Sequence, residues 1–167
     1  FTRYYHNPGS NEDNAVYGLY EDSDSTIWVG AIGLGLDLLN WKTGKYTTFK
    51  HDPADLNTIS SNLIGPMEKG EANELWIITY GGGVNKLDRS TGKFRQYLPG
   101  LRIFSIYRDA SGVLWVGSAI GLHRYDKPAD RFEFIVNEDK QNIFGGVHAL
   151  TNDHENNLWM STDHGIF

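Results

Sequence analysis

The sequence of 167 residues contains no cysteine, which excludes disulfide bonds and thiol chemistry. It has no apolar run long enough to cross a bilayer, since the best candidate, residues 26–36, stops at Asp37. A sustained apolar stripe with the period of a helix is also missing, so we expect no long helix. The formal net charge of −6 disfavours anionic partners. We therefore expect no nucleic-acid partner and no direct membrane contact from this segment.

What the sequence does contain is glycine, with 19 residues, and a tryptophan that returns four times in one setting. Each tryptophan follows an aliphatic residue and a polar turn, and a glycine with a branched aliphatic residue comes shortly after it. The repeated positions are Trp28, Trp76, Trp115 and Trp159. A period of roughly 40 residues with strand chemistry in every unit is typical of a β-propeller.

Each unit is predicted to contain four short strands. The innermost strand precedes the polar turn, the second carries the tryptophan, the third follows the glycine, and the outermost is aromatic. Innermost strands are expected at 15–21, 63–68, 102–108 and 147–152, and outermost strands at 46–49, 94–97 and 132–135. The Thr-Gly pairs at Gly44 and Gly92 suit the tight turn before the outermost strand, because glycine adopts a positive φ without cost.

The fold class that follows is all-β, a propeller of four-stranded antiparallel blades with three whole and two partial blades. Whole blades are expected at 15–49, 62–97 and 102–135, an incomplete blade at 146–167, and the outer strand of a preceding blade at 1–5. We expect an open arc that is a fragment of a larger propeller. The alternative is a closed four-bladed ring in which residues 2–5 complete the last blade. The common setting of the tryptophans predicts that all four are buried between successive blades.

Several motifs invite a sharper chemical interpretation. Asp22 and Asp153 open acidic turns with the outline of a calcium loop, but an EF-type loop needs a glutamate at its twelfth position, where this chain has Gly33 and His164. The same outline is similar to the Asp-box of sialidases, which is a structural hairpin. The six histidines show no metal-ligand spacing. The glycine-rich corners are followed by strands rather than by the helix that a phosphate site requires. We expect no catalytic residue, no metal and no cofactor.

The unit D-x-x-G-x-LW-[IV]-G, followed by G-L-x-x-[YL]-[DN]-x-x-T-G-x-[FY], resembles the two-component regulator propeller repeat. The resemblance extends over nearly the whole chain. Two positions depart from the pattern: the second unit has Gly70 where the others have aspartate, and the first has Ser25 in place of the turn glycine.

The best-known members of that family are the extracytoplasmic sensor regions of hybrid histidine kinases from Bacteroides-type bacteria. The resemblance implies a non-catalytic periplasmic sensor segment that detects an oligosaccharide and regulates glycan-utilisation genes. It also implies a histidine kinase elsewhere in the intact protein and a homodimer formed through the intact sensor. Two alternatives stay open: a propeller enzyme of the streptogramin-lyase type, and a purely structural or dimerisation propeller.

The candidate binding residues lie in the part of the sequence that does not repeat. Loops that enter the innermost strands and corners that follow the tryptophan strands share one face of a propeller, and they vary most between the units. Sugars are recognised by an aromatic face together with planar polar groups. The ligand-binding residues predicted on this face are Tyr80, Arg102, Asp163 and His164.

Overall fold

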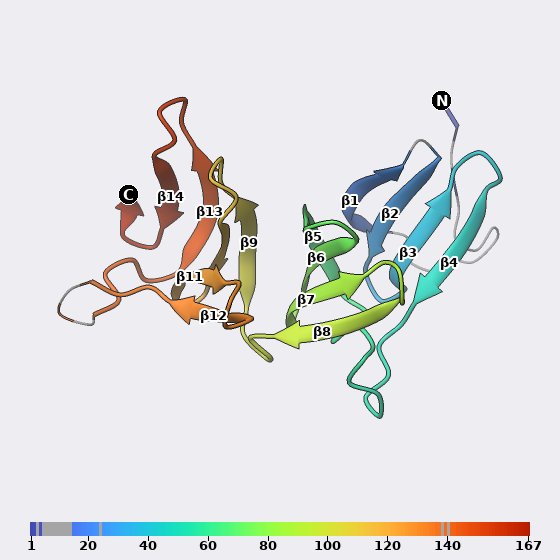
Figure 1. Ribbon diagram of the computed structural model, residues 1–167, viewed down its shortest axis with the longest axis horizontal. Helices are drawn as coiled ribbons and strands as arrows, with labels where there is room; N and C mark the ends of the chain where they lie inside the picture. Colours follow the sequence, from blue (N-terminus) through green and yellow to red (C-terminus); the bar gives the residue numbers. More distant parts are fainter. Residues whose placement is uncertain (3, 5–14, 24, 138, 140) are drawn as a thin grey trace.

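The computed structural model describes residues 1–2, 4, 15–23, 25–137, 139 and 141–167. All regular structure in these residues is β-strand, arranged in four antiparallel sheets that follow one another along the chain (Figure 1). No described helix is long and apolar enough to cross a membrane. The expected all-β architecture of successive blades is confirmed.

Every sheet is a simple meander in which neighbours in sequence are neighbours in space. The first sheet contains β1 (Val16–Ser23), β2 (Thr26–Ala31), β3 (Gly35–Asn40) and β4 (Lys45–Phe49). The second contains β5 (Ile64–Lys69), β6 (Glu74–Thr79), β7 (Gly83–Asp88) and β8 (Lys93–Tyr97). The third contains β9 (Ile103–Arg108), β10 (Leu114–Ser118), β11 (Gly121–Asp126) and β12 (Arg131–Phe134). The fourth contains β13 (Val147–Asn152), β14 (Leu158–Thr162) and β15 (Gly165–Ile166).

The tight turns before the outermost strands form as their sequences predict. Gly44 and Gly92 both have a φ of 70°, which a residue with a Cβ adopts only at a cost. In the third sheet Asp130 takes a φ of 48° in the corresponding turn. Aspartate tolerates this region better than most residues, and the carboxylate of Asp130 is held there by several donors described below.

The core lies between the sheets rather than inside any one of them. Trp28 of the first sheet packs with Leu87 and Phe94 of the second, and it is 2% exposed. Trp76 of the second sheet is 1% exposed and meets the ring of Phe132 in the third, with centroids 5.7 Å apart. Trp28 and Trp76 therefore each reach forward onto the last two strands of the next sheet.

The prediction that all four tryptophans are buried is wrong for the last of them. Trp115 is only partly buried, and Trp159 is 45% exposed. The reason is the forward packing: the fourth sheet offers Trp115 only the short β15 and no fourth strand, and no further sheet covers Trp159 in the described residues.

The expected outer strand at residues 1–5 does not appear in its described part. Phe1, Thr2 and Tyr4 lie outside the strands, and the remaining two residues lie outside the described ranges. The Tyr4 hydroxyl donates a hydrogen bond of 3.1 Å to the carbonyl oxygen of Trp41 in the first sheet. In the described residues β15 pairs only with β14, so the structure contains no closed four-bladed ring.

Candidate functional site

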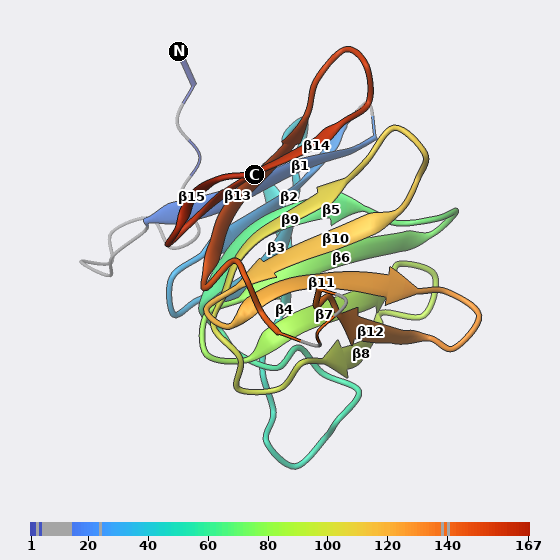
Figure 2. The same cartoon turned by 90° about the vertical axis from the view of Figure 1, so that its left-hand side faces the viewer.

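The four innermost strands are neighbours in the order β1, β5, β9 and β13. They lie in a row across Figure 1 and overlap in the turned view of Figure 2. Each carries a β-bulge at the same point, directly after the first residue of its ladder. A bulge leaves one residue unpaired and redirects its side chain. The residues directly after the first ladder residue are Tyr17, Gly65, Phe104 and His148, and in β5 the irregularity also includes Pro66.

Three of the four bulges present an aromatic ring, and the second sheet supplies its ring from elsewhere. Tyr80, which follows β6, lies over Gly65: a Cβ at position 65 would stand 3.2 Å from Cζ of Tyr80. The ring of Tyr80 also makes an edge contact with Tyr17, with centroids 6.4 Å apart. Four rings, one from each sheet, therefore follow the inner edge; we call Tyr17, Tyr80, Phe104 and His148 the ring row.

The second half of the ring row contains a stacked pair and a cation. Phe104 and His148 are stacked, with centroids 4.8 Å apart and planes inclined by 25°. The guanidinium carbon of Arg102 lies 5.4 Å from the centroid of Phe104, within cation–π range. Arg102, Phe104 and Tyr80 line a shallow hollow of about 150 Å³ between the second and third sheets. The structure thus brings together two of the four predicted ligand-binding residues.

Asp163 joins the same site through a histidine. Its carboxylate accepts hydrogen bonds from Nε2 of His148, at 2.8 Å, and from the backbone N–H of Gly146, at 2.7 Å. The hydrogen bond from His148, followed by that from Gly146, lowers the pKa of Asp163. Asp163 is therefore an ionised acceptor at the end of the ring row near neutral pH.

His164 does not join the others. Its Nδ1 lies 3.1 Å from the carbonyl oxygen of Ile143, so the ring faces the loop that precedes its own sheet. Its charge contributes to lowering the pKa of the neighbouring Asp163, but no hydrogen bond or ring contact joins its side chain to Tyr80, Arg102 or Asp163 among the described residues. Of the four predicted residues, Tyr80, Arg102 and Asp163 therefore lie at the ring row, and His164 does not.

The site residues predicted from the sequence do not include Tyr17, Phe104 or His148. All three follow an aliphatic residue at the start of an innermost strand, and strand alternation gives no reason to single them out. A usable signal existed in the repeat itself: the position after Val16, Ile64, Ile103 and Val147 holds tyrosine, glycine, phenylalanine and histidine in turn. A position that changes character inside a constant frame is a candidate for recognition.

Chemically, the site offers faces for stacking, one guanidinium and one carboxylate. These groups suit a neutral, hydroxyl-rich ligand with apolar ring faces. In the described part of the chain no group of three or more histidine, cysteine, aspartate or glutamate side chains could hold a metal ion. The arrangement can offer ring faces and charged hydrogen-bond partners to a ligand.

A family model described as "Two component regulator propeller" matches residues 11–33 and 97–119. The chain carries two-component regulator propeller repeats. The two matched segments include β1 with β2 and β9 with β10, the strand pairs that contain the bulge and the tryptophan.

Comparison with curated proteins gives a relative whose name describes a histidine kinase. "Histidine kinase P4" of Formosa agariphila is 24% identical over 165 residues, which cover 92% of this chain and 12% of that protein. The chain therefore spans a small part of the length of this curated relative.

Two solved structures from B. thetaiotaomicron have the same fold. One is the extracellular domain of a protein assigned as a one component system, with a TM-score of 0.67, 18% identity, and coverage of 90% of this chain and 22% of that one. The other is the extracellular domain of a protein assigned as a hybrid two component system, with a TM-score of 0.55, 20% identity, and coverage of 98% and 29%. At these identities the comparison establishes the fold of the regulator propeller.

Proposed function

We propose that this chain is a non-catalytic sensor segment of a hybrid two-component protein, placed outside the cytoplasm. The observation that carries the proposal is the ring row, a recognition surface built from one ring per sheet on a repeat of the regulator propeller family. The relatives support it, because one is a histidine kinase and two are extracellular domains assigned to signalling systems. The kinase would lie elsewhere in the intact protein.

The ligand class we propose is an oligosaccharide. Stacking on tyrosine and phenylalanine faces binds the apolar faces of sugar rings, and Arg102 and Asp163 can exchange hydrogen bonds with hydroxyl groups. The ring row runs across four sheets, so it fits a ligand of several linked units better than a compact one. Binding would report the presence of glycan fragments and would regulate glycan-utilisation genes, with the intact periplasmic sensor acting as a homodimer.

Calorimetry on the intact sensor against a panel of glycan fragments tests this proposal. We expect affinity on the order of micromolar, near −8 kcal/mol, for a shallow site of this type. Combined substitution of Tyr80, Phe104 and Arg102 by alanine should abolish binding. Trp41→Ala is the matched control. Trp41 and Tyr80 are each 39% exposed, and Trp41 lies at the end of the first sheet that is remote from the ring row.

Two results would count against the proposal. Turnover of any glycan by the purified protein would contradict the sensor role. Binding that survives the triple substitution would contradict the assignment of the binding site to the ring row. It would not contradict the sensor role, because the ligand would then bind at another site.

A further inference from the structure

Three of the four repeats share one interaction, a hydrogen bond from the tryptophan indole N–H to the carboxylate of an aspartate six residues earlier. The distances are 2.9 Å for Trp28 and Asp22, 2.7 Å for Trp115 and Asp109, and 2.8 Å for Trp159 and Asp153. In the second repeat the aspartate is replaced by Gly70. The side chain of Trp76 is 1% exposed, and its indole N–H donates no hydrogen bond among the described residues, although it is not one of the fully buried polar atoms without a partner, Ser105 Oγ and Asn152 Oδ1.

The first repeat shows what such a carboxylate binds besides the indole. Asp22 also accepts a hydrogen bond of 2.5 Å from the guanidinium of Arg89 in the second sheet. Burial alone would raise the pKa of Asp22, but the hydrogen bonds from Trp28 and Arg89 outweigh it, and the pKa is lowered. The chain therefore already contains a carboxylate held between an indole N–H and a guanidinium.

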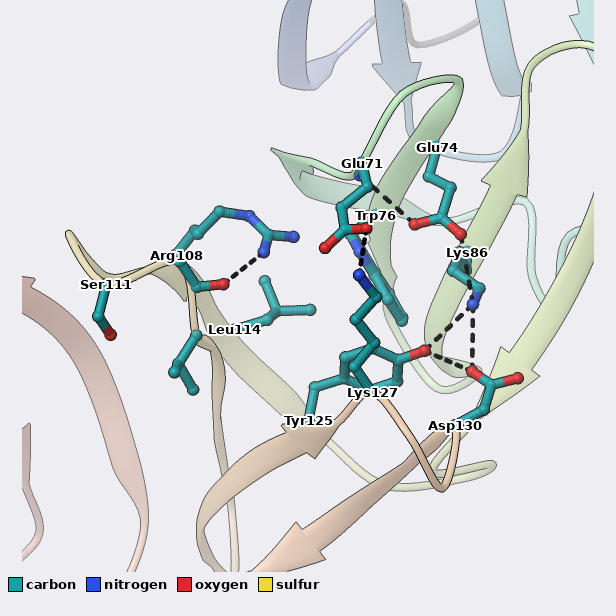
Figure 3. A pocket seen from close by; sticks show the side chains of 12 residues that line it. Glu71, Glu74, Trp76, Lys86, Arg108, Ser111, Leu114, Tyr125, Lys127 and Asp130 are labelled. Atoms are coloured by element: carbon teal, nitrogen blue, oxygen red, sulfur yellow. Dashed lines mark hydrogen bonds and ion pairs between the residues drawn. The ribbon is translucent and has the colours of Figure 1, made fainter.

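In the second repeat the space beside the tryptophan is a cavity of about 360 Å³, at the end of the sheets opposite the ring row. Figure 3 shows it between Trp76 and Lys86 of the second sheet and Arg108, Leu114 and Tyr125 of the third. Its volume is within the range of small-molecule sites.

The chain cannot fill this cavity with a side chain from position 70. A Cβ on Gly70 would lie 2.4 Å from Cβ of Glu74 and 2.7 Å from its carbonyl carbon, both closer than real contacts allow. The backbone of this hairpin is packed against itself, so position 70 cannot place a carboxylate beside Trp76. The carboxylates that line the cavity are those of Glu71, Glu74 and Asp130.

Two of the three cations that line the cavity are already neutralised. Lys86 donates to Asp130 at 3.1 Å and lies 3.5 Å from a carboxylate oxygen of Glu74. Lys127 is paired with Glu71 at 2.6 Å. Both ammonium groups therefore have carboxylate partners within the chain.

Arg108 is different. Its Nε donates to the carbonyl oxygen of Lys69 at 3.0 Å and its Nη1 to that of Gly112 at 2.7 Å. No carboxylate of the described residues lies within ion-pair distance of it. The cavity wall thus carries a guanidinium with no carboxylate at ion-pair distance, although its charge helps to lower the pKa of Glu71 on the same wall. It also carries an indole N–H that donates no hydrogen bond among the described residues. In the first repeat a guanidinium and an indole N–H together hold the carboxylate of Asp22.

We propose that this cavity is a binding site for a small monocarboxylate, up to the size of a uronic acid. The carboxylate would accept hydrogen bonds from Arg108 and from the indole N–H of Trp76, and the body of the ligand would lie against Leu114 and Tyr125. Charge-assisted hydrogen bonds of this kind are about twice as strong as neutral ones, and Arg108 supplies one without first breaking an ion pair. The site is separate from the ring row and does not depend on the function proposed for it.

Calorimetry with the intact protein and glucuronate as the probe tests the proposal, with glucose as the uncharged control. Saturable binding is expected for glucuronate and none for glucose at the same concentration. Arg108→Gln should weaken glucuronate binding roughly tenfold or more, the loss expected for a hydrogen bond to a charged group. Arg124→Gln is the matched control, since Arg124 lies on the same sheet and pairs with Glu133 at 2.9 Å. The Arg124→Gln variant should bind glucuronate as tightly as the unchanged protein.

A second variant guards against an effect of Arg108 on folding alone. Trp76→Phe removes the indole N–H together with part of the ring, so its folding is checked by denaturant unfolding. In the folded variant glucuronate binding should also weaken severalfold. Arg102→Ala, in the ring row, should leave it unchanged. Absence of saturable glucuronate binding, equal affinity in the Arg108→Gln variant, or loss of binding in the Arg102→Ala variant would each overturn the proposal.

Discussion

Lys86 on β7 and Asp130, in the turn between β11 and β12, join the second and third sheets by a hydrogen bond of 3.1 Å from Nζ to Oδ1. The ammonium of Lys86 also lies 5.4 Å from the ring centroid of Trp76 and 5.6 Å from that of Tyr125. Asp130 in turn accepts a hydrogen bond of 2.6 Å from the hydroxyl of Tyr97. This half-buried network is the polar counterpart of the tryptophan packing at the same interface.

Replacing Asp130 by asparagine should destabilise the protein, because the ammonium of Lys86 would remain half-buried without its closest carboxylate. We expect a loss of about 1–3 kcal/mol in the free energy of unfolding, less than for a fully buried pair because both groups keep some contact with water. Denaturant unfolding measures it. Glu133→Gln, at an exposed ion pair, should cost less than about 0.5 kcal/mol; equal losses for the two variants would contradict the network.

The same carboxylate should make stability depend on pH. Burial raises the pKa of Asp130, but hydrogen bonds from Tyr125, Tyr97 and Lys86 outweigh it and lower the pKa from 3.8 to about 2. Because the folded-state pKa is depressed, the contribution of Asp130 is complete above pH 4 and is lost as pH falls toward 2. Unfolding measured across this window should show a shallower loss of stability for Asp130→Asn than for the unchanged protein. Parallel curves for the two proteins would contradict this assignment.

The tryptophans should differ in their contribution to stability. Trp28→Ala removes a side chain that is 2% exposed and should cost roughly 3–5 kcal/mol, as for other large truncations in a core. Trp159→Ala removes one that is 45% exposed and should cost about 1 kcal/mol. Denaturant unfolding of the two variants makes the comparison. A large loss for Trp159 would mean that another surface covers it in solution.

Close approach of the innermost strands gives a further prediction. A Cβ on Gly18 would stand 2.3 Å from the carbonyl oxygen of Gly65, and a backbone atom cannot rotate away. Gly18→Ala should therefore push β1 and β5 apart and cost roughly 1–3 kcal/mol, measured by thermal or denaturant unfolding.

Ser105→Ala is the control at the equivalent position of the third sheet. The hydroxyl of Ser105 is buried without a partner among the described residues, so its removal should be neutral or slightly stabilising. A neutral Gly18→Ala would show that the first two sheets are not packed as closely as described.

The periodic part of the sequence predicts the periodic part of the structure. The tryptophan frame places the four sheets, and the expected innermost strands agree with β1, β5, β9 and β13 to within two residues at either end. These features are local, because each strand and turn is specified by residues within its own repeat. The burial of a tryptophan is not local, since it depends on the next sheet, and for that reason the prediction fails at Trp159.

The site was predictable only in part, for a similar reason. Tyr80, Arg102 and Asp163 stand out in sequence as polar or aromatic residues in variable loops. Phe104 and His148 do not, because a bulge shifts the alternation of inward and outward residues and the strand pattern carries no mark of that shift. The replacement of aspartate by Gly70 is visible in the sequence, but the cavity beside Trp76 depends on where Arg108 of the following repeat lies.

The bulges have a consequence for how such a surface can change. A bulge residue takes no part in the ladder, and in three sheets its ring contacts other rings of the ring row rather than the buried core clusters, so exchanging it leaves those clusters intact. Recognition can thus change at Tyr17, Phe104 or His148 by one substitution in each repeat without a change in the ladder. In the second repeat the residue at the bulge is Gly65, which has no side chain, and the ring at that place comes from Tyr80 instead. A lineage of proteins with this frame could therefore diverge in what they bind long before they diverge in how they fold.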